Sequence, residues 1–137
     1  MGTAFWGSGP CGRGPAGLEL DLEDIRKELE RRKPRIGVGQ TARREADEVE
    51  ILSGLFNGHT TGAALTLMVR NRDVDSSEYE KIRFTPRPGH ADYTAWVKYS
   101  GFNDYRGGGM FSGRVTAALV MAGAVAAKLL SSLKIEI

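Results

Sequence analysis

The chain has 137 residues, of which 41% are apolar and 26% are charged, and its formal net charge is +2 at pH 7. This length predicts one domain, and the composition is ordinary for a soluble globular protein. The small excess of basic residues argues against general binding to nucleic acid or to a membrane surface.

The cysteine and histidine content limits the chemistry further. Cys11 is the only cysteine, so an intrachain disulfide is excluded, which fits a reducing cytoplasm. With two histidines besides, a zinc site of the usual ligands is not expected. A secretory signal is not expected either, because no basic start precedes an apolar run. Residues 115–127 are the most apolar segment, but they are shorter than the roughly 20 residues of a membrane span, so we predict a buried helix.

The first 32 residues divide into a segment without a regular pattern and a predicted helix. Residues 1–17 are rich in glycine and proline, which predicts a flexible or degenerate tail before a domain at 18–137. Residues 21–32 predict a helix, because Asp21 is a good N-cap and Leu22, Ile25 and Leu29 form one apolar stripe. The helix should end before Pro34.

A dense basic cluster follows this helix. It allows two interpretations: a solvated helix end with cations at its negative pole, or a loop that offers arginines to a phosphorylated ligand. Spacing does not decide between them. The cluster consists of Arg31, Arg32, Lys33, Arg35, Arg43 and Arg44.

The middle and end of the chain predict an α+β fold, with antiparallel β-hairpins and packed helices. Residues 48–56 and 64–71 alternate as strands, joined by a turn at 57–62 that carries an exposed His59. Ser77 and Glu80 favour one short helical turn, whereas prolines keep residues 84–89 out of a helix. Residues 112–132 predict a second helix that is apolar on nearly every face, which suggests that further chain or a partner completes its core. Residues 133–137 alternate like a strand.

Two neighbouring segments carry the candidate chemistry. Three glycines after Arg106, followed by a helix start and Arg114, favour a phosphate cradle, although flexible loops also use such glycines. His90 follows a proline and a glycine and is either a general acid or base, or a structural histidine bonded within its loop. Arg87 would favour its neutral form or hold an anionic substrate beside it.

These segments resemble the chorismate synthase family, and their sequence pattern resembles its archaeal-type branch. The resemblance rests on Arg87-Pro88-Gly89-His90-Ala91-Asp92 and on Tyr105-Arg106-Gly107-Gly108-Gly109-Met110-Phe111-Ser112-Gly113-Arg114, and it extends over Gln40-Thr41-Ala42-Arg43-Arg44-Glu45 and Glu50-Ile51-Leu52-Ser53-Gly54. It implies elimination of phosphate from 5-enolpyruvylshikimate 3-phosphate with reduced FMN, in the shikimate pathway to aromatic amino acids. It also implies an incomplete β-α-β sandwich, a cytoplasmic location and a homotetramer.

The resemblance also implies site residues. His90 would be the catalytic proton donor to the flavin, and Met110, Phe111 and Ser112, with Arg106, would bind FMN. Arg32, Arg87 and Arg114 would hold the phosphorylated substrate, with Arg32 also a candidate for a nicotinamide nucleotide such as NADPH, the candidate reductant of the flavin. No metal is implied.

Departures from the family pattern lead to an expectation about activity. The family opens on a Gly-Glu-Ser-His-Gly strand whose histidine is the other catalytic acid, and no such histidine precedes Pro15. Val38 stands where the pattern has a substrate-loop arginine, and family members run more than twice this length. We therefore expect a fragmentary or degenerate chorismate synthase without turnover. The alternative is a non-catalytic flavin- or phosphate-binding or self-associating remnant.

Overall fold

A computed structural model describes residues 2–6, 14–32, 48–70 and 77–136. The chain divides into two compact units, which are treated separately below. The first comprises Met1–Arg72 and Thr116–Ile137, and the second is Asp73–Val115. Helices and antiparallel strands both occur, so the α+β class is confirmed.

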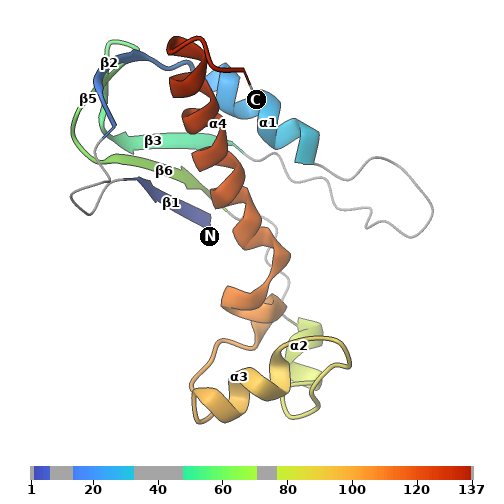
Figure 1. The fold of residues 1–137 in the computed structure, drawn as a ribbon. Helices are drawn as coiled ribbons and strands as arrows, with labels where there is room; N and C mark the ends of the chain where they lie inside the picture. Colours follow the sequence, from blue (N-terminus) through green and yellow to red (C-terminus); the bar gives the residue numbers. More distant parts are fainter. Residues whose placement is uncertain (1, 7–13, 33–47, 71–76, 137) are drawn as a thin grey trace. The chain divides into compact units, whose positions relative to one another are not determined.

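The first unit holds two three-stranded antiparallel sheets. One has the order β1-β6-β3, with β1 at Gly2–Trp6, β6 at Leu65–Val69 and β3 at Val49–Ser53. The other has the order β2-β5-β4, with β2 at Ala16–Glu19, β5 at His59–Thr61 and β4 at Leu55–Phe56. Figure 1 shows β1, β6 and β3 lying side by side.

The predicted hairpin is confirmed, with a second hairpin set into it. β3 pairs with β6, and between them β4 and β5 pair around the two-residue turn Asn57-Gly58. These residues have φ of 47° and 76°, as a type I′ turn requires, and Asn-Gly is the pair that adopts it most readily. His59 was expected at the tip of the turn, but it lies in β5, exposed, with Nδ1 2.9 Å from the carbonyl oxygen of Asn57.

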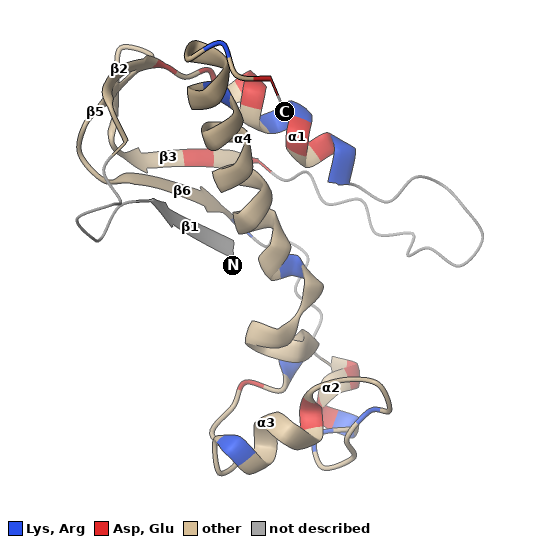
Figure 2. Cartoon of the chain, viewed as in Figure 1, with Lys and Arg blue, Asp and Glu red and all other residues tan. Residues whose placement is uncertain are grey.

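Two antiparallel helices pack beside the first sheet. α1 (Leu22–Arg32) confirms the predicted first helix, and α4 (Thr116–Ser132) packs against α1, β1 and β6 (Figure 1). Hydrogen bonds join the helices near both ends: Lys128 Nζ donates to Asp24 Oδ2 at 2.7 Å, and Arg32 Nε donates to Thr116 Oγ1 at 3.2 Å. Figure 2 shows charged residues along α1 and few on α4.

The core of this unit lies between the helices and the strands. Ile25, Leu29 and Met121 are its largest fully buried side chains. They pack with apolar residues of β3 and β6 and with the buried face of α4. The opposite face of α4 is not covered within the described residues, since Leu119 is 69% exposed. The helix is therefore buried on one side and not on several.

The apolar run around α4 is longer than the sequence indicated. The helical run Gly113–Ser132 has 20 residues and a mean hydropathy of 1.7, so by length and composition it could cross a membrane. Core helices of soluble proteins satisfy the same criterion, and Ala117, Met121, Ala124 and Val125 of this run are buried in the core. The absence of a membrane partner stays a prediction.

Two predictions about the chain ends are wrong. The residues Gly2–Trp6, expected within a tail of no regular structure, form β1 and pair with β6. Residues 133–137 were expected as a strand, but those described end α4 with a Schellman motif. Lys134 has φ of 59°, and the N–H of Ile135 donates to the carbonyl of Leu130 at 3.0 Å.

The second unit consists of short helices and turns. α2 (Ser77–Lys81) confirms the predicted helical turn, and residues 84–89 are not helical, as expected. α3 (Asp92–Lys98) was not predicted, and two 3₁₀ helices follow, η1 (Arg106–Phe111) and η2 (Gly113–Val115). Ala95 is the one buried apolar side chain among the described residues of this unit.

Candidate functional site

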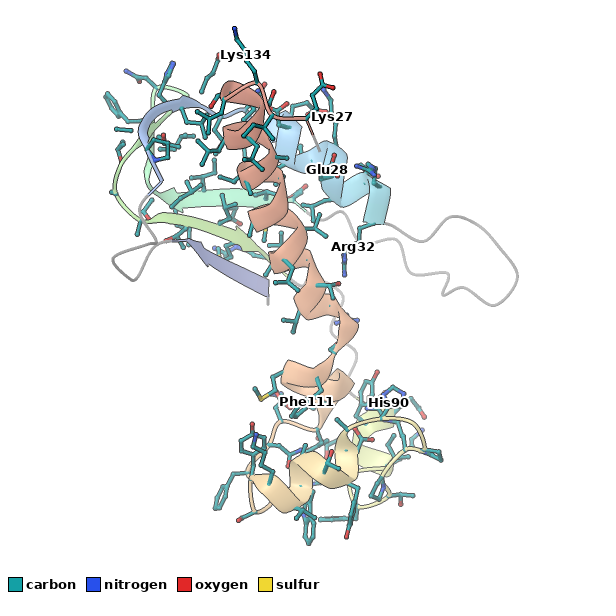
Figure 3. All side chains as sticks on the ribbon, viewed as in Figure 1. Lys27, Glu28, Arg32, His90, Phe111 and Lys134 are labelled. Atoms are coloured by element: carbon teal, nitrogen blue, oxygen red, sulfur yellow. The ribbon has the colours of Figure 1, made fainter. Side chains whose placement is uncertain are left out.

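His90 closes a tight turn just before α3. Its backbone N–H donates to the Arg87 carbonyl at 3.3 Å, and Gly89 has φ of 75°, which suits position three of a type II turn after Pro88. The imidazole is exposed and makes no hydrogen bond with any described residue (Figure 3). The side chain is therefore accessible for proton transfer to a bound molecule.

The guanidinium of Arg87 is bound to the carboxylate of Asp92. Nε donates to Oδ2 at 2.8 Å, Nη2 donates to Oδ1 at 2.9 Å, and the backbone N–H of Arg87 donates to Oδ2 at 3.0 Å. The hydrogen bond from the guanidinium, against a smaller effect of burial, lowers the pKa of Asp92 to about 2. The same bond raises the pKa of Arg87. The predicted anion contact is thus already engaged by a carboxylate.

Arg106 shows the same arrangement in the next loop. Its Nε and Nη2 both donate to Asp104 at 2.9 Å, and its backbone N–H donates to Asp104 Oδ1 at 3.0 Å. These hydrogen bonds lower the pKa of Asp104 and raise the pKa of Arg106. Tyr105, between them, donates to Glu80 Oε1 at 2.6 Å, and this bond raises the pKa of its phenol.

The three glycines after Arg106 adopt conformations that side chains disfavour. Gly107, Gly108 and Gly109 have φ of 63°, 85° and 52°, and Gly109 has ψ of −130°. A Cβ at Gly109 would collide with the carbonyl oxygen of Asp104. A Cβ at Gly107 would meet nothing within 4 Å. The loop therefore has one position closed by its own backbone and one position open to an approaching molecule.

The residues after the glycines present an apolar surface and a helix cap. Met110 is 67% exposed and Phe111 is 49% exposed, and the ring of Phe111 lies 6.4 Å from that of Tyr99. Ser112 Oγ accepts the N–H of Arg114 at 3.3 Å, so Ser112 caps a helix start as predicted. The cap begins η2, and the α-helical turns start later, at Thr116.

Arg32 belongs to the first unit, where it has a structural contact. Its Nε donates to Thr116 Oγ1 at 3.2 Å, and neighbouring Arg31 pairs with Glu28 at 2.8 Å. The other members of the basic cluster, Lys33, Arg35, Arg43 and Arg44, lie outside the described residues, as does Val38. The choice between the two interpretations of that cluster stays open.

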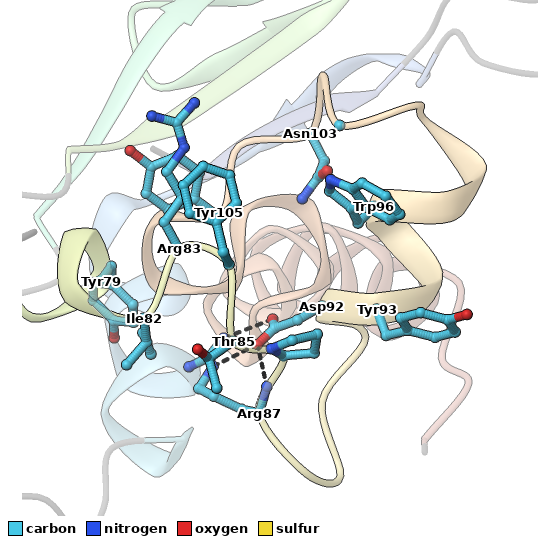
Figure 4. A pocket seen from close by; sticks show the side chains of 13 residues that line it. Tyr79, Ile82, Arg83, Thr85, Arg87, Asp92, Tyr93, Trp96, Asn103 and Tyr105 are labelled. Carbon is cyan, nitrogen blue, oxygen red and sulfur yellow. Dashed lines mark hydrogen bonds and ion pairs between the residues drawn. The ribbon is translucent and has the colours of Figure 1, made fainter.

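The described part of the second unit also contains a pocket that the sequence did not reveal. It has a volume of about 340 Å³ and lies between α2, α3 and the loops around them (Figure 4). In addition to the Arg87–Asp92 pair, its wall carries five aromatic rings and a further arginine: Tyr79, Arg83, Phe84, Tyr93, Trp96 and Tyr105. These residues come from α2, from α3, which was not predicted, and from the loops around them, so the sequence did not mark them as one wall. In the described ranges no cluster of His, Cys, Asp and Glu side chains is arranged for a metal ion.

Comparison with known proteins gives the family. The model of the family described as "Chorismate synthase" matches residues 12–137. The chain belongs to the chorismate synthase family. A chorismate synthase from Korarchaeum cryptofilum is 58% identical over 90% of this chain and 34% of its own length, and one from Aeropyrum pernix is 61% identical over 82% of this chain and 29% of its own length.

A solved structure supports the fold assignment. The chain resembles a crystal structure of chorismate synthase with a TM-score of 0.62 at 30% identity, over 99% of this chain and 36% of that chain. The α+β fold of the chorismate synthase type is therefore confirmed. The chain spans about a third of the length of these relatives. The roles of His90, the glycine loop and the arginines stay predictions.

Proposed function

We propose that this chain contributes the proton-transfer histidine and the glycine-rich flavin loop of a chorismate synthase. The reaction is the 1,4-anti elimination of phosphate from 5-enolpyruvylshikimate 3-phosphate, which gives chorismate. The family match over residues 12–137 carries the proposal, because it includes both His90 and the loop at 106–114. When bound, reduced FMN takes part in this elimination without net oxidation or reduction.

The loop after Arg106 fits a flat ring system with polar substituents. Met110 and Phe111 offer exposed apolar area, and the hydroxyl of Ser112 lies next to them in sequence. Gly107 leaves open space beside the backbone, so a ring or a phosphate can approach it closely. Met110, Phe111 and Ser112 would hold the ring, and Arg106 would share its charge between Asp104 and the ligand.

His90 is the residue we assign to proton transfer. Its exposed imidazole can donate a proton from a ring nitrogen, because none of its described neighbours occupies that nitrogen. Arg87, Arg114 and Arg32 would bind the phosphate and carboxylates of the substrate. Arg87 must do so while Asp92 holds its guanidinium, which weakens the attraction for an anion.

We further propose that the 137-residue chain has no turnover by itself. The chain spans about a third of its relatives, and the other two thirds of a relative would supply the rest of the pocket. An anaerobic assay with reduced FMN, NADPH as the reductant, and 5-enolpyruvylshikimate 3-phosphate should yield no chorismate. The Korarchaeum cryptofilum relative serves as the positive control. Robust turnover by the chain would refute this part of the proposal.

A non-catalytic remnant is the second candidate. It is favoured because the guanidinium groups of two candidate anion-binding arginines are already bound to carboxylates. Arg87 and Arg106 each donate hydrogen bonds from two guanidinium nitrogens to a carboxylate of the same unit. FMN titration separates the candidates. Quenching of flavin fluorescence that disappears in an Arg106→Gln/Arg114→Gln double variant, but not in a Lys81→Gln/Lys98→Gln control, supports a surviving flavin site. No quenching, together with concentration-dependent oligomers in sedimentation, supports the remnant, and tetramers would agree with the family expectation.

A further inference from the structure

We propose that the pocket in Asp73–Val115 binds a flat aromatic ring that carries one carboxylate. The pocket lies on the aromatic side of the Arg87–Asp92 pair, and its wall does not include the residues assigned to the flavin. The wall does include Arg87, which the proposed lyase function assigns to the substrate, so the two proposals share that residue. The ring binding proposed here nevertheless does not rest on the lyase function.

The wall of the pocket is built for a planar apolar ligand. Phe84, Tyr93 and Trp96 are 83%, 61% and 56% exposed, so their rings present faces that a ligand could cover. Aromatic rings bury large apolar areas and favour stacked or edge-to-face contacts with another ring. A volume of about 340 Å³ is at the small end of ligand pockets, roughly 300–1,000 Å³, so one or two fused rings would fill it.

Arg83 gives the pocket a guanidinium that no described carboxylate holds. Its Cζ lies 5.2 Å from the ring centroid of Phe84 and 5.0 Å from that of Tyr105. Figure 4 shows Arg83 beside Tyr105 at the pocket wall. Cation–π contacts of this kind use the face of the guanidinium and leave its in-plane N–H donors for an anion. This contrasts with Arg87 and Arg106, whose donors are engaged.

The charges on the wall favour a single negative charge. Arg83 and Arg87 are cations and Asp92 is an anion, so the lining carries a net charge of about one positive unit. A carboxylate would match that charge and could accept two parallel hydrogen bonds from Arg83. A phosphate dianion would exceed it and would also be repelled by Asp92.

Titration of the ¹⁵N-labelled full chain with three probes tests the proposal. 2-Naphthoate has the ring and the carboxylate, 2-naphthylmethanol keeps only the ring, and cyclohexanecarboxylate keeps only the carboxylate. The readout is the indole N–H signal of Trp96, which a Trp96→Phe variant assigns because the chain has two tryptophans. We expect 2-naphthoate to shift this signal with a dissociation constant of roughly 1 mM or tighter, and the other probes to bind at least about tenfold more weakly.

Two variants test whether Arg83 binds the carboxylate of the ligand. Arg83→Gln should weaken 2-naphthoate about tenfold and leave 2-naphthylmethanol unchanged, whereas Lys98→Gln, an exposed cation of the same unit outside the pocket, should change neither. FMN should leave the 2-naphthoate shifts in place. Equal affinity for the three probes, no loss in Arg83→Gln, or displacement of 2-naphthoate by FMN would each overturn the proposal. If Arg83→Gln unfolds, the ranking of the probes on the unmodified chain decides.

Discussion

Arg87 and Asp92 face each other as a two-pronged ion pair, with Nε–Oδ2 at 2.8 Å and Nη2–Oδ1 at 2.9 Å, and both side chains are only about a quarter exposed. Asp92 is also the first residue of α3, so the pair joins the His90 turn to a helix start. An anion that approaches Arg87 must share its guanidinium with this carboxylate.

The pair predicts a specific acid sensitivity of the second unit. Because the folded pKa of Asp92 is about 2, below its ordinary value of 3.8, its stabilisation is complete above pH 3.8 and disappears as the pH falls through 2. Asp92→Asn should lower the free energy of unfolding by about 1 kcal/mol at pH 7 and should flatten the pH dependence between 3.8 and 2. Urea denaturation followed by circular dichroism across that range measures both. An unchanged slope in the variant would show that the pair contributes no stability.

The glycine loop predicts an unequal response at two adjacent sites. Gly109→Ala should cost at least about 2 kcal/mol of stability in this unit, because the new Cβ meets the Asp104 carbonyl at a positive φ. Gly107→Ala is the matched control: it shares the positive φ, but its Cβ is unobstructed, so about 1 kcal/mol is expected. Hydrogen exchange of the amides at 105–115 reports the difference. Equal costs would argue against this loop geometry.

The packing of α1 against α4 predicts where the core is sensitive. Met121 has 0% exposure, so Met121→Ala should leave a cavity and cost about 2–5 kcal/mol. Leu119 is on the same helix and 69% exposed, so Leu119→Ala should change stability by less than about 0.5 kcal/mol. Urea midpoints of the two variants test the assignment of the buried face, which a similar loss in both would contradict.

The end of α4 predicts a stabilising substitution. Lys134 has φ of 59° at the position where a Schellman motif favours glycine. Lys134→Gly should raise the unfolding free energy by about 0.5–1 kcal/mol, and Lys134→Val should lower it, because a β-branched residue fits this conformation poorly. Thermal unfolding in the two variants should therefore shift in opposite directions. A shift in the same direction would mean that the last residues of the chain adopt another conformation.

The sequence predicted elements whose signals are local. The N-cap at Asp21 and the stripe of Ile25 and Leu29 placed α1 within one residue of its observed start, because capping and helical periodicity agree there. The turn-forming residues at 57–62 also predicted a turn, which the structure narrows to Asn57-Gly58. β1 was missed, since a strand among glycines forms only because β6, some sixty residues later, offers it an edge. The alternation of apolar and charged residues at 133–136 is too short to specify a strand, and these residues instead form the end of α4.

Local backbone features around the candidate residues could be predicted, but the partners of their side chains could not. The position of His90 on an exposed turn followed from Pro88 and Gly89, and the helix cap followed from Ser112. The partners of Arg87 and Arg106 did not, although Asp92 and Asp104 lie five and two residues away, because an acidic neighbour marks an ion pair only once the turn between them is known. The aromatic pocket was invisible, since its rings come from separate helices and loops.

The position of β6 between β1 and β3 also has a consequence for solubility. β6 is an uncharged run without proline, Leu-Thr-Leu-Met-Val, of the kind that pairs with copies of itself when its edge is bare. On one side β3 covers it, and Glu50 of β3 forms an ion pair, at 2.7 Å, with Arg70, the residue that follows β6. On the other side only the five residues of β1 cover it. Removal of Gly2–Trp6 would therefore leave that edge of β6 bare and open to pairing with another chain.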